Sequence, residues 1–126
     1  MINTDKQIKE FLADISMELP EIYTSMENCL DEYDGFAPTK MFNQFCEETN
    51  KAMRNRDEKT LNEHLSYISK KLFHANAIEY EYIDVYYVES LMWNVSNSES
   101  KWAWSLFPEN IKKLYVKMWG IPKFNK

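Results

Sequence analysis

Apolar residues recur at helical spacing along most of this chain. Between Thr4 and Leu19 they stand three and four positions apart, which predicts one helix with Thr4 as its N-cap and an inward face of Ile8, Phe11, Leu12 and Ile15. Pro20 suits the first turn of a second helix, which is expected to continue until Asp34 and Gly35 end it. Its predicted inward face consists of Ile22, Met26, Cys29, Leu30 and Tyr33.

Two further stretches with a stripe of apolar residues at helical spacing follow in the middle of the chain. Residues 38–56 are predicted to form a third helix that buries Met41, Phe42, Phe45, Thr49, Ala52 and Met53. Residues 58–75 are predicted to form a fourth, capped by Asp57 and burying Leu61, Leu65, Ile68 and Leu72. The short connections indicate that neighbouring helices pack antiparallel.

The segment from Asn76 to Val95 has a different pattern, because apolar and aromatic side chains point in almost every direction around a helix. A surface helix would keep its charges on one side, so we expect this segment to be the buried central helix, over about 77–95. A tight turn with left-handed geometry at Asn76 is expected before it. Its polar residues predict a buried polar site formed by Glu81, Asp84, Glu89 and Tyr82.

A strand is the alternative for part of this segment. Ile78, Tyr80 and Tyr82 alternate with glutamates, and β-branched and aromatic residues favour strands. Ile83 breaks the alternation, and no partner strand is visible elsewhere in the chain. We therefore prefer the helix.

Ser96 to Phe107 is the long non-periodic stretch, and we expect it to be a loop. Its aromatic residues Trp102, Trp104 and Phe107 are too apolar to lie free in solvent. The segment is predicted to fold back over the helices as a lid, with a protein interface as the alternative. A last helix over residues 108–119 then ends at Gly120 and Pro122.

These elements predict an all-α fold with five to six helices in antiparallel hairpins, forming one domain over residues 1–126. The chain contains only two glycines, which disfavours β architectures rich in tight turns. Nothing in it resembles a signal peptide or a membrane span, so we expect a cytoplasmic protein without membrane contact. Cys29 and Cys46 are accordingly expected to be reduced and buried.

The net charge of −5 is unevenly distributed. Nine acidic residues stand between Met1 and Asp34, against Lys6 and Lys9, whereas from Lys101 onward six lysines stand against Glu109. The two ends of the chain could pack together, or the first third could form an acidic face for a cationic partner through Glu27, Asp31, Glu32 and Asp34. Binding to nucleic acid is disfavoured, because an acidic chain has no broad cationic surface.

The sequence contains no motif for phosphate binding, nucleophilic catalysis or metal coordination, and no cofactor is expected. A zinc site from Cys29, Cys46, His64 and His74 is conceivable, although the spacing matches no zinc-finger pattern. Paired carboxylates, Glu81 with Asp84 or Glu27 with Asp31, leave a small carboxylate- or metal-dependent enzyme as an alternative.

The second half of the chain resembles small all-helical bacterial proteins of uncharacterised function. The features that carry the resemblance are Asn76-Ala77-Ile78, Val88-Glu89-Ser90-Leu91 and the proline-led last helix. Some members of such families are encoded in toxin and immunity neighbourhoods. The resemblance implies no catalytic residues.

The hypothesis that follows is a non-enzymatic protein-binding module, of the immunity type, that neutralises a cationic partner protein through its acidic N-terminal helices. The rivals are the small enzyme and a helical structural adaptor, for which no sequence repeat is visible.

Overall fold

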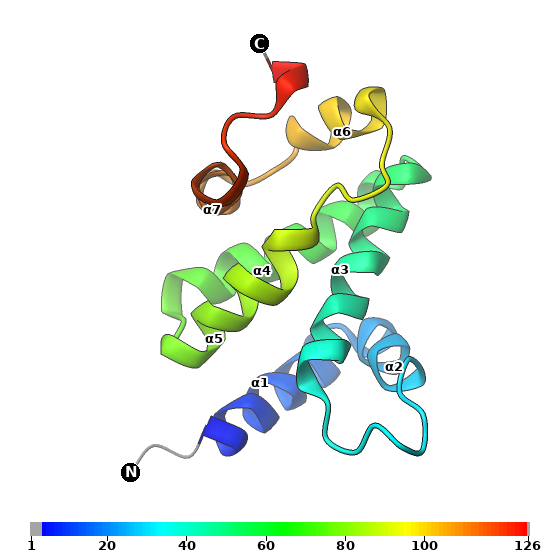
Figure 1. Ribbon diagram of the computed structural model, residues 1–126, viewed down its shortest axis with the longest axis vertical. Coiled ribbons are helices and arrows are strands. Elements are labelled where there is room, and N and C mark those ends of the chain that lie inside the picture. The colour runs from blue at the N-terminus through cyan, green and yellow to red at the C-terminus, as the bar shows by residue number, and fades with distance from the viewer. Residues whose placement is uncertain (1–3, 126) are drawn as a thin grey trace.

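The computed structural model describes residues 4–125, and within that range every regular element is helical. The predicted all-α class is therefore confirmed, with seven α-helices instead of five to six. Figure 1 shows α1 and α2 at one end of an elongated arrangement, α3 to α5 in the middle, and α6 and α7 at the other end. The elements are α1 Thr4–Glu18, α2 Pro20–Asn28, α3 Pro38–Arg54, α4 Glu58–His74, α5 Ala77–Glu81, the π-helix η1 Tyr82–Tyr87, the 3₁₀ helix η2 Val88–Ser90, α6 Asn97–Trp104, α7 Glu109–Trp119 and the 3₁₀ helix η3 Lys123–Asn125.

Helix α3 is the centre of the core and contacts α2, α4 and η1. Every residue of its predicted stripe is buried, together with Cys46 and Asn50. Phe45 lies at the centre of this packing, because its ring lies edge-on to His64 of α4 and to Tyr87 of η1, with centroid distances of 5.4 and 5.0 Å. One aromatic side chain thus connects three elements that are far apart in the sequence.

The first helix agrees with its prediction in bounds and buried face, but α2 ends at Asn28, five residues before Tyr33. Tyr33 is 88% exposed instead of facing inward. The cause is local: Asp34 Oδ2 accepts from the backbone N–H of Asp31, and Asp31 Oδ1 accepts from that of Tyr33, both at 2.8 Å. Such side-chain bonds to the backbone compete with a further helical turn.

The predicted central helix over 77–95 is wrong in its regularity and in its end. Helix α5 begins with a capping box between Asn76 and Glu79, and Asn76 is extended, with φ −75°, instead of left-handed. The chain then passes through the π-helix and one 3₁₀ turn and leaves helical geometry after Ser90. The strand alternative is excluded for this segment.

Asn50 of α3 accounts for the turn that follows η2. Its side-chain amide donates to the carbonyl of Ser90 at 2.9 Å, and its Oδ1 accepts from the backbone N–H of Met92 at 2.8 Å. Met92 and Asn94 have positive φ values of 67° and 56°, a conformation that is uncommon for residues with a Cβ. The buried amide therefore holds the backbone in a turn that the local sequence does not specify.

The stretch from Ser96 to Phe107 contains a helix where a loop was expected. Ser96 and Glu99 form a second capping box, which starts α6. The prediction that the aromatic segment folds back is confirmed, since Trp104 and Phe107 are buried and Trp102 is half-buried. Helix α7 agrees with its predicted range and ends at Gly120, which has a φ of +81°.

The acidic and the basic parts of the chain do not pack together. Figure 1 shows α1 and α2 at the end of the molecule opposite to α7. The intramolecular explanation for the charge gradient is therefore wrong. Among residues 4–125, no helix combines the length and the apolar character that a membrane span requires.

Candidate functional site

A cleft of about 430 Å³ lies where α1 gives way to α2, against α3 and the first turns of α4. Four of its ten lining residues are glutamates, and one is a lysine. The residues that line it are Glu18, Leu19, Pro20, Glu21, Ile22, Glu48, Lys59, Thr60, Glu63 and His64.

Two local features position these residues. The backbone N–H of Leu19 still bonds to the carbonyl of Ile15 at 2.7 Å, but Pro20 has no N–H and starts a new helix. Glu18 and Glu21 consequently lie on the two sides of a helix break. On the opposite side, Asp57 caps α4 and accepts from the backbone N–H and the hydroxyl of Thr60, at 3.2 and 2.8 Å.

His64 is the buried member of the cleft lining, with only 2% of its surface exposed. Its Nδ1 lies 2.9 Å from Thr49 Oγ1, which also lies 3.2 Å from the carbonyl oxygen of Phe45 and 2.8 Å from the hydroxyl of Tyr87. A hydroxyl has one proton and two lone pairs, and a carbonyl only accepts. All three contacts are hydrogen bonds if Thr49 donates to Phe45 and accepts from Tyr87 O–H and His64 Nδ1–H.

This assignment leaves Nε2 of the neutral imidazole as an acceptor. Nε2 has no hydrogen-bond partner among residues 4–125, yet no buried side-chain nitrogen or oxygen in that range lacks one. Nε2 therefore retains contact with solvent, and the hollow that His64 lines is the cleft. Burial lowers the pKa of His64 from 6.5 to about 4, against the opposing influence of Glu48 and Asp57.

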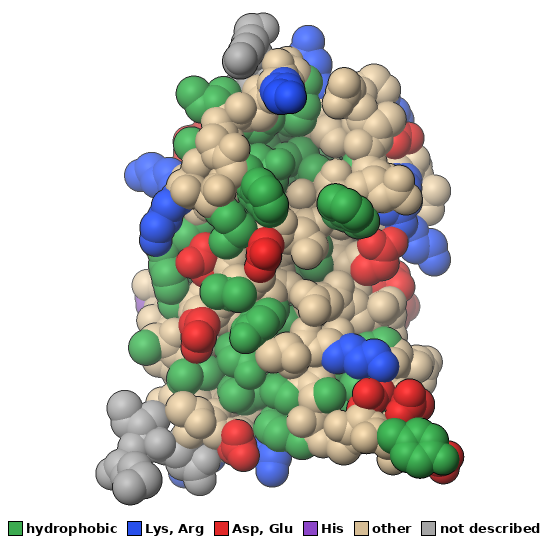
Figure 2. Space-filling model, in the orientation of Figure 1, with side chains coloured by type: hydrophobic (Ala, Val, Ile, Leu, Met, Phe, Trp, Pro, Cys, Tyr) green, Lys and Arg blue, Asp and Glu red, His purple; other side chains and the backbone are tan. Residues whose placement is uncertain are grey.

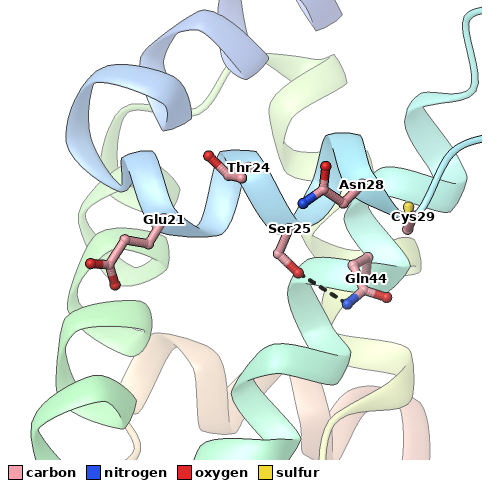
Figure 3. A pocket seen from close by; sticks show the side chains of 6 residues that line it. All are labelled: Glu21, Thr24, Ser25, Asn28, Cys29 and Gln44. Carbon is pink, nitrogen blue, oxygen red and sulfur yellow. Dashed lines mark hydrogen bonds between the residues drawn. The ribbon is translucent and has the colours of Figure 1, made fainter.

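A second, shallower hollow continues from the cleft along α2, and Glu21 lines both. Figure 3 shows Glu21, Thr24 and Asn28 along α2 and the hydrogen bond between Ser25 and Gln44 of α3. Ser25 Oγ and Gln44 Nε2 both donate to Glu48 Oε1, at 3.1 and 3.2 Å. Glu48 is thereby fixed between the two hollows.

Cys29 lies at the far end of the second hollow and is half-buried, not fully buried as predicted. Cys46 is buried, and burial raises the pKa of both thiols. The two cysteines form no disulfide.

The predicted acidic face is divided by the structure. Glu27, Asp31 and Glu32 are exposed at the end of α2 and in the loop that follows. Asp34 instead forms an ion pair with Lys40 at 2.8 Å, and its pKa is lowered by that hydrogen bond and by its bond to the backbone of Asp31. Asp34 uses its carboxylate to close the loop, so that carboxylate is less available to a partner protein than those of Glu27, Asp31 and Glu32.

The predicted buried polar site does not form. Glu81 and Glu89 are exposed, Asp84 is half-buried, and only Tyr82 is buried. The prediction assumed one regular helical phase up to Val95, whereas Glu81 belongs to α5, Asp84 to the π-helix and Glu89 to the 3₁₀ turn, so no common phase runs through them.

The aromatic residues predicted as an interface are mostly used inside the protein. Trp104 packs against Phe107 and Tyr115, with ring centroids at 5.2 and 5.5 Å, and Lys112 lies 5.5 Å over its ring. Trp102 is half-buried, with the Arg56 guanidinium 5.5 Å above its ring.

Sequence reasoning missed the tryptophans that are exposed. Trp93 is 74% and Trp119 is 58% exposed. Trp119 Nε1 donates to the carbonyl of Glu89 at 2.9 Å, so α7 ends beside η2. Figure 2 shows hydrophobic side chains scattered over the face of the molecule that carries residues 77–95.

Sequence reasoning also missed the cleft, whose acidic residues come from four helices. The available signal was the Glu-Leu-Pro-Glu sequence of residues 18–21, in which a proline separates two glutamates. No three His, Cys, Asp or Glu side chains within residues 4–125 are placed to hold a metal ion, so the conceivable zinc site is not formed there. The chemistry of the cleft is that of hydrogen-bond acceptors and negative charge.

A family model matches residues 12–120, which is most of the 126-residue chain and includes all cleft residues. Its description is Domain of unknown function (DUF7674). Comparisons with curated proteins and with solved structures find no match. The family agrees with the expected likeness to uncharacterised proteins, while the toxin and immunity context stays a prediction. Because this family model covers residues 12–120, the chain belongs to the family described as Domain of unknown function (DUF7674).

Proposed function

We propose that this protein is a binding module for a basic partner protein, which it neutralises in the manner of an immunity protein, and that its acidic α1–α2 end forms the contact. The observation that supports this most is the set of carboxylates that the fold leaves exposed at this end. None of the ion pairs within residues 4–125 involves Glu18, Glu21, Glu27, Asp31 or Glu32.

The arrangement favours a cationic partner for an electrostatic reason. Carboxylates near each other at a surface repel, and that repulsion is relieved when a partner brings positive charge. Such complementarity accelerates the encounter and selects against acidic competitors. Glu18 and Glu21 line the cleft, and Glu27 lines a separate hollow between α1 and α2. Asp31 and Glu32 are exposed in the loop that follows, so the carboxylates surround the α1–α2 end.

Copurification tests this proposal. The tagged protein is expressed in cells of its source, captured at low ionic strength, and its retained proteins are quantified by mass spectrometry. We compare the wild type with Glu27→Gln/Asp31→Asn/Glu32→Gln, which removes three exposed charges. Asn keeps an oxygen that can accept from the Tyr33 N–H as Asp31 does, so the loop is preserved.

The control is Glu58→Gln/Glu89→Gln/Glu109→Gln, which removes three exposed carboxylates that belong to α4, η2 and α7 and not to α1 or α2. We expect a protein of basic composition that the wild type and the control retain, that the acidic-loop variant loses at least tenfold, and that salt elutes. Equal recovery of the same proteins by all three forms would contradict the proposal.

A further inference from the structure

We infer that the cleft between the α1–α2 break and α4 is a binding site for a guanidinium group, and that it receives one arginine side chain of the basic partner. This inference rests on the proposed function and specifies where on the acidic end the main contact lies. It concerns the residues that line the cleft and does not depend on the loop with Glu27, Asp31 and Glu32.

The first support is that the cleft offers acceptors from four helices. Glu18 ends α1, Glu21 begins α2, Glu48 belongs to α3 and Glu63 to α4. A group that enters the cleft therefore faces negative charge on several sides. A volume of about 430 Å³ lies within the usual range of small-molecule pockets and accommodates a long side chain.

The second and independent support is His64. This side chain is 2% exposed, its Nδ1–H is used by Thr49, and its Nε2 has no partner among the described residues. In the tautomer that satisfies every contact of Thr49, Nε2 is a bare acceptor in a hollow already lined by carboxylates. Because Nε2 keeps contact with solvent, it can accept from water in the free protein, and a ligand that supplies N–H groups can take the place of that water.

The third support is the shortage of donors in the lining itself. The Thr60 hydroxyl donates to Asp57, and Lys59 is the single cation of the lining and is exposed. Glu48 uses one oxygen for Ser25 and Gln44, and its other oxygen has no hydrogen-bond partner among residues 4–125. The cleft thus has several unused acceptors and few donors.

A guanidinium satisfies these requirements better than an ammonium or a metal ion. It carries five donors in one plane and no acceptor, so it can bond to carboxylates and to Nε2 simultaneously. It is also less strongly hydrated than an ammonium and enters a partly buried site more readily. A metal ion is not favoured, because the carboxylates and His64 are not grouped as ligands within the described residues.

An NMR titration with three synthetic peptides tests the inference. The ¹⁵N-labelled protein is titrated with acetyl-Gly-Gly-Arg-Gly-Gly-amide and with the same peptide carrying citrulline or lysine. Citrulline has the shape of arginine without its charge. We expect saturable shifts of the His64 ring signals and of the backbone amides of Glu18, Glu21 and Glu63 with the arginine peptide. The apparent Kd should be at least tenfold weaker with citrulline and severalfold weaker with lysine.

Two variants weaken the site: Glu63→Gln removes a negative charge, and His64→Asn removes the Nε2 acceptor together with the ring contact to Phe45. Glu63→Gln and His64→Asn should each weaken binding of the arginine peptide by at least fivefold, because Asn keeps a donor for Thr49 but has nothing at the position of Nε2. The matched control, Glu58→Gln, lies on the same helix outside the cleft and should bind as the wild type does.

Shifts of equal size with citrulline, unchanged affinity in Glu63→Gln, or equal affinity for lysine would each overturn the assignment to a guanidinium. These results are separate from the copurification experiment. A partner lost by the loop variant, together with no peptide binding in the cleft, would refute this inference alone.

Discussion

Replacing Asn50 by Leu is expected to lower the free energy of unfolding by about 2–4 kcal/mol. Asn50 is 1% exposed, and its amide bonds both the carbonyl of Ser90 and the N–H of Met92. Leu has a similar volume but leaves both backbone groups without these partners. The buried Met92 N–H costs about 1–3 kcal/mol when unsatisfied, and the carbonyl of the exposed Ser90 adds less. The turn with positive φ at Met92 loses its support as well.

Urea denaturation followed by circular dichroism measures this effect. The control is Asn43→Leu, an exposed position on the same helix, for which we expect a change within about 0.5 kcal/mol. If the two variants were equally stable, Asn50 would not be holding the turn, and the description of residues 90–94 would have to change.

The second large effect concerns pH. The pKa of His64 is about 4 in the folded protein against an ordinary value of 6.5. The unfolded chain therefore binds more protons than the folded one between these values, and stability falls as the pH decreases from about 6.5 to about 4. The contribution of neutral His64 to the stability of the fold is complete above pH 6.5. The difference corresponds to roughly 3 kcal/mol lost on acidification through this window.

The groups around His64 determine how this loss is measured. Glu48 and Asp57 favour its protonated form, but burial outweighs them. Glu18, Glu21, Glu63 and Lys59 share the cleft with it. Because carboxylates begin to titrate near pH 4, the measurement compares variants instead of using one curve.

Unfolding by urea is measured between pH 4.5 and 7.5 for the wild type, for His64→Asn and for the exposed His74→Asn. We expect His64→Asn to be less stable at neutral pH, because it loses the ring contact with Phe45, but to depend much less on pH. His74→Asn should retain the pH dependence of the wild type. If the stability of His64→Asn depended on pH as steeply as that of the wild type, other titratable groups would be responsible for the pH dependence.

The sequence predicted best the helices whose apolar residues keep a regular period. Helices α1, α3, α4 and α7 have nearly the predicted bounds, and the stripe of α3 is buried without exception. The Asp57 cap of α4 was also predictable, because an N-cap depends on residues within one turn.

The central segment was not predictable from an α-helical period. Tyr82 and Tyr87, and likewise Ile83 and Val88, are buried pairs that stand five positions apart. Five residues correspond to about 140° on an α-helix, so the pattern seemed to cover every side. In the π-helix, where hydrogen bonds join residues five apart, the members of each pair lie on one face.

The candidate site was predictable only in part. The excess of acidic residues in the first third is visible in the sequence, and so is the helix break at Pro20. The hydrogen bonds of Thr49 to His64 and Tyr87 join residues 15 and 38 positions away, and no local pattern indicates them. The cleft arises from such long-range contacts, so it appears only when the four helices are placed together.

Because Trp104 and Phe107 are buried, they do not offer a surface to a partner protein. These residues belong to the core of the α6–α7 end, and Trp104 lies in ring contact with Tyr115 and Phe124. A partner that binds the acidic end would leave them untouched. Substituting them is therefore a test of stability and not of binding.

Native mass spectrometry of the protein, purified gently from its source, tests the central claim most directly, because one spectrum reports bound protein, metal and small molecule together. We predict a complex with one basic polypeptide that dissociates as the ammonium acetate concentration is raised before spraying. The charge-removing variant Glu27→Gln/Asp31→Asn/Glu32→Gln should release it at lower concentration. A monomer carrying a stoichiometric metal ion or small molecule, with no polypeptide bound, would contradict the account.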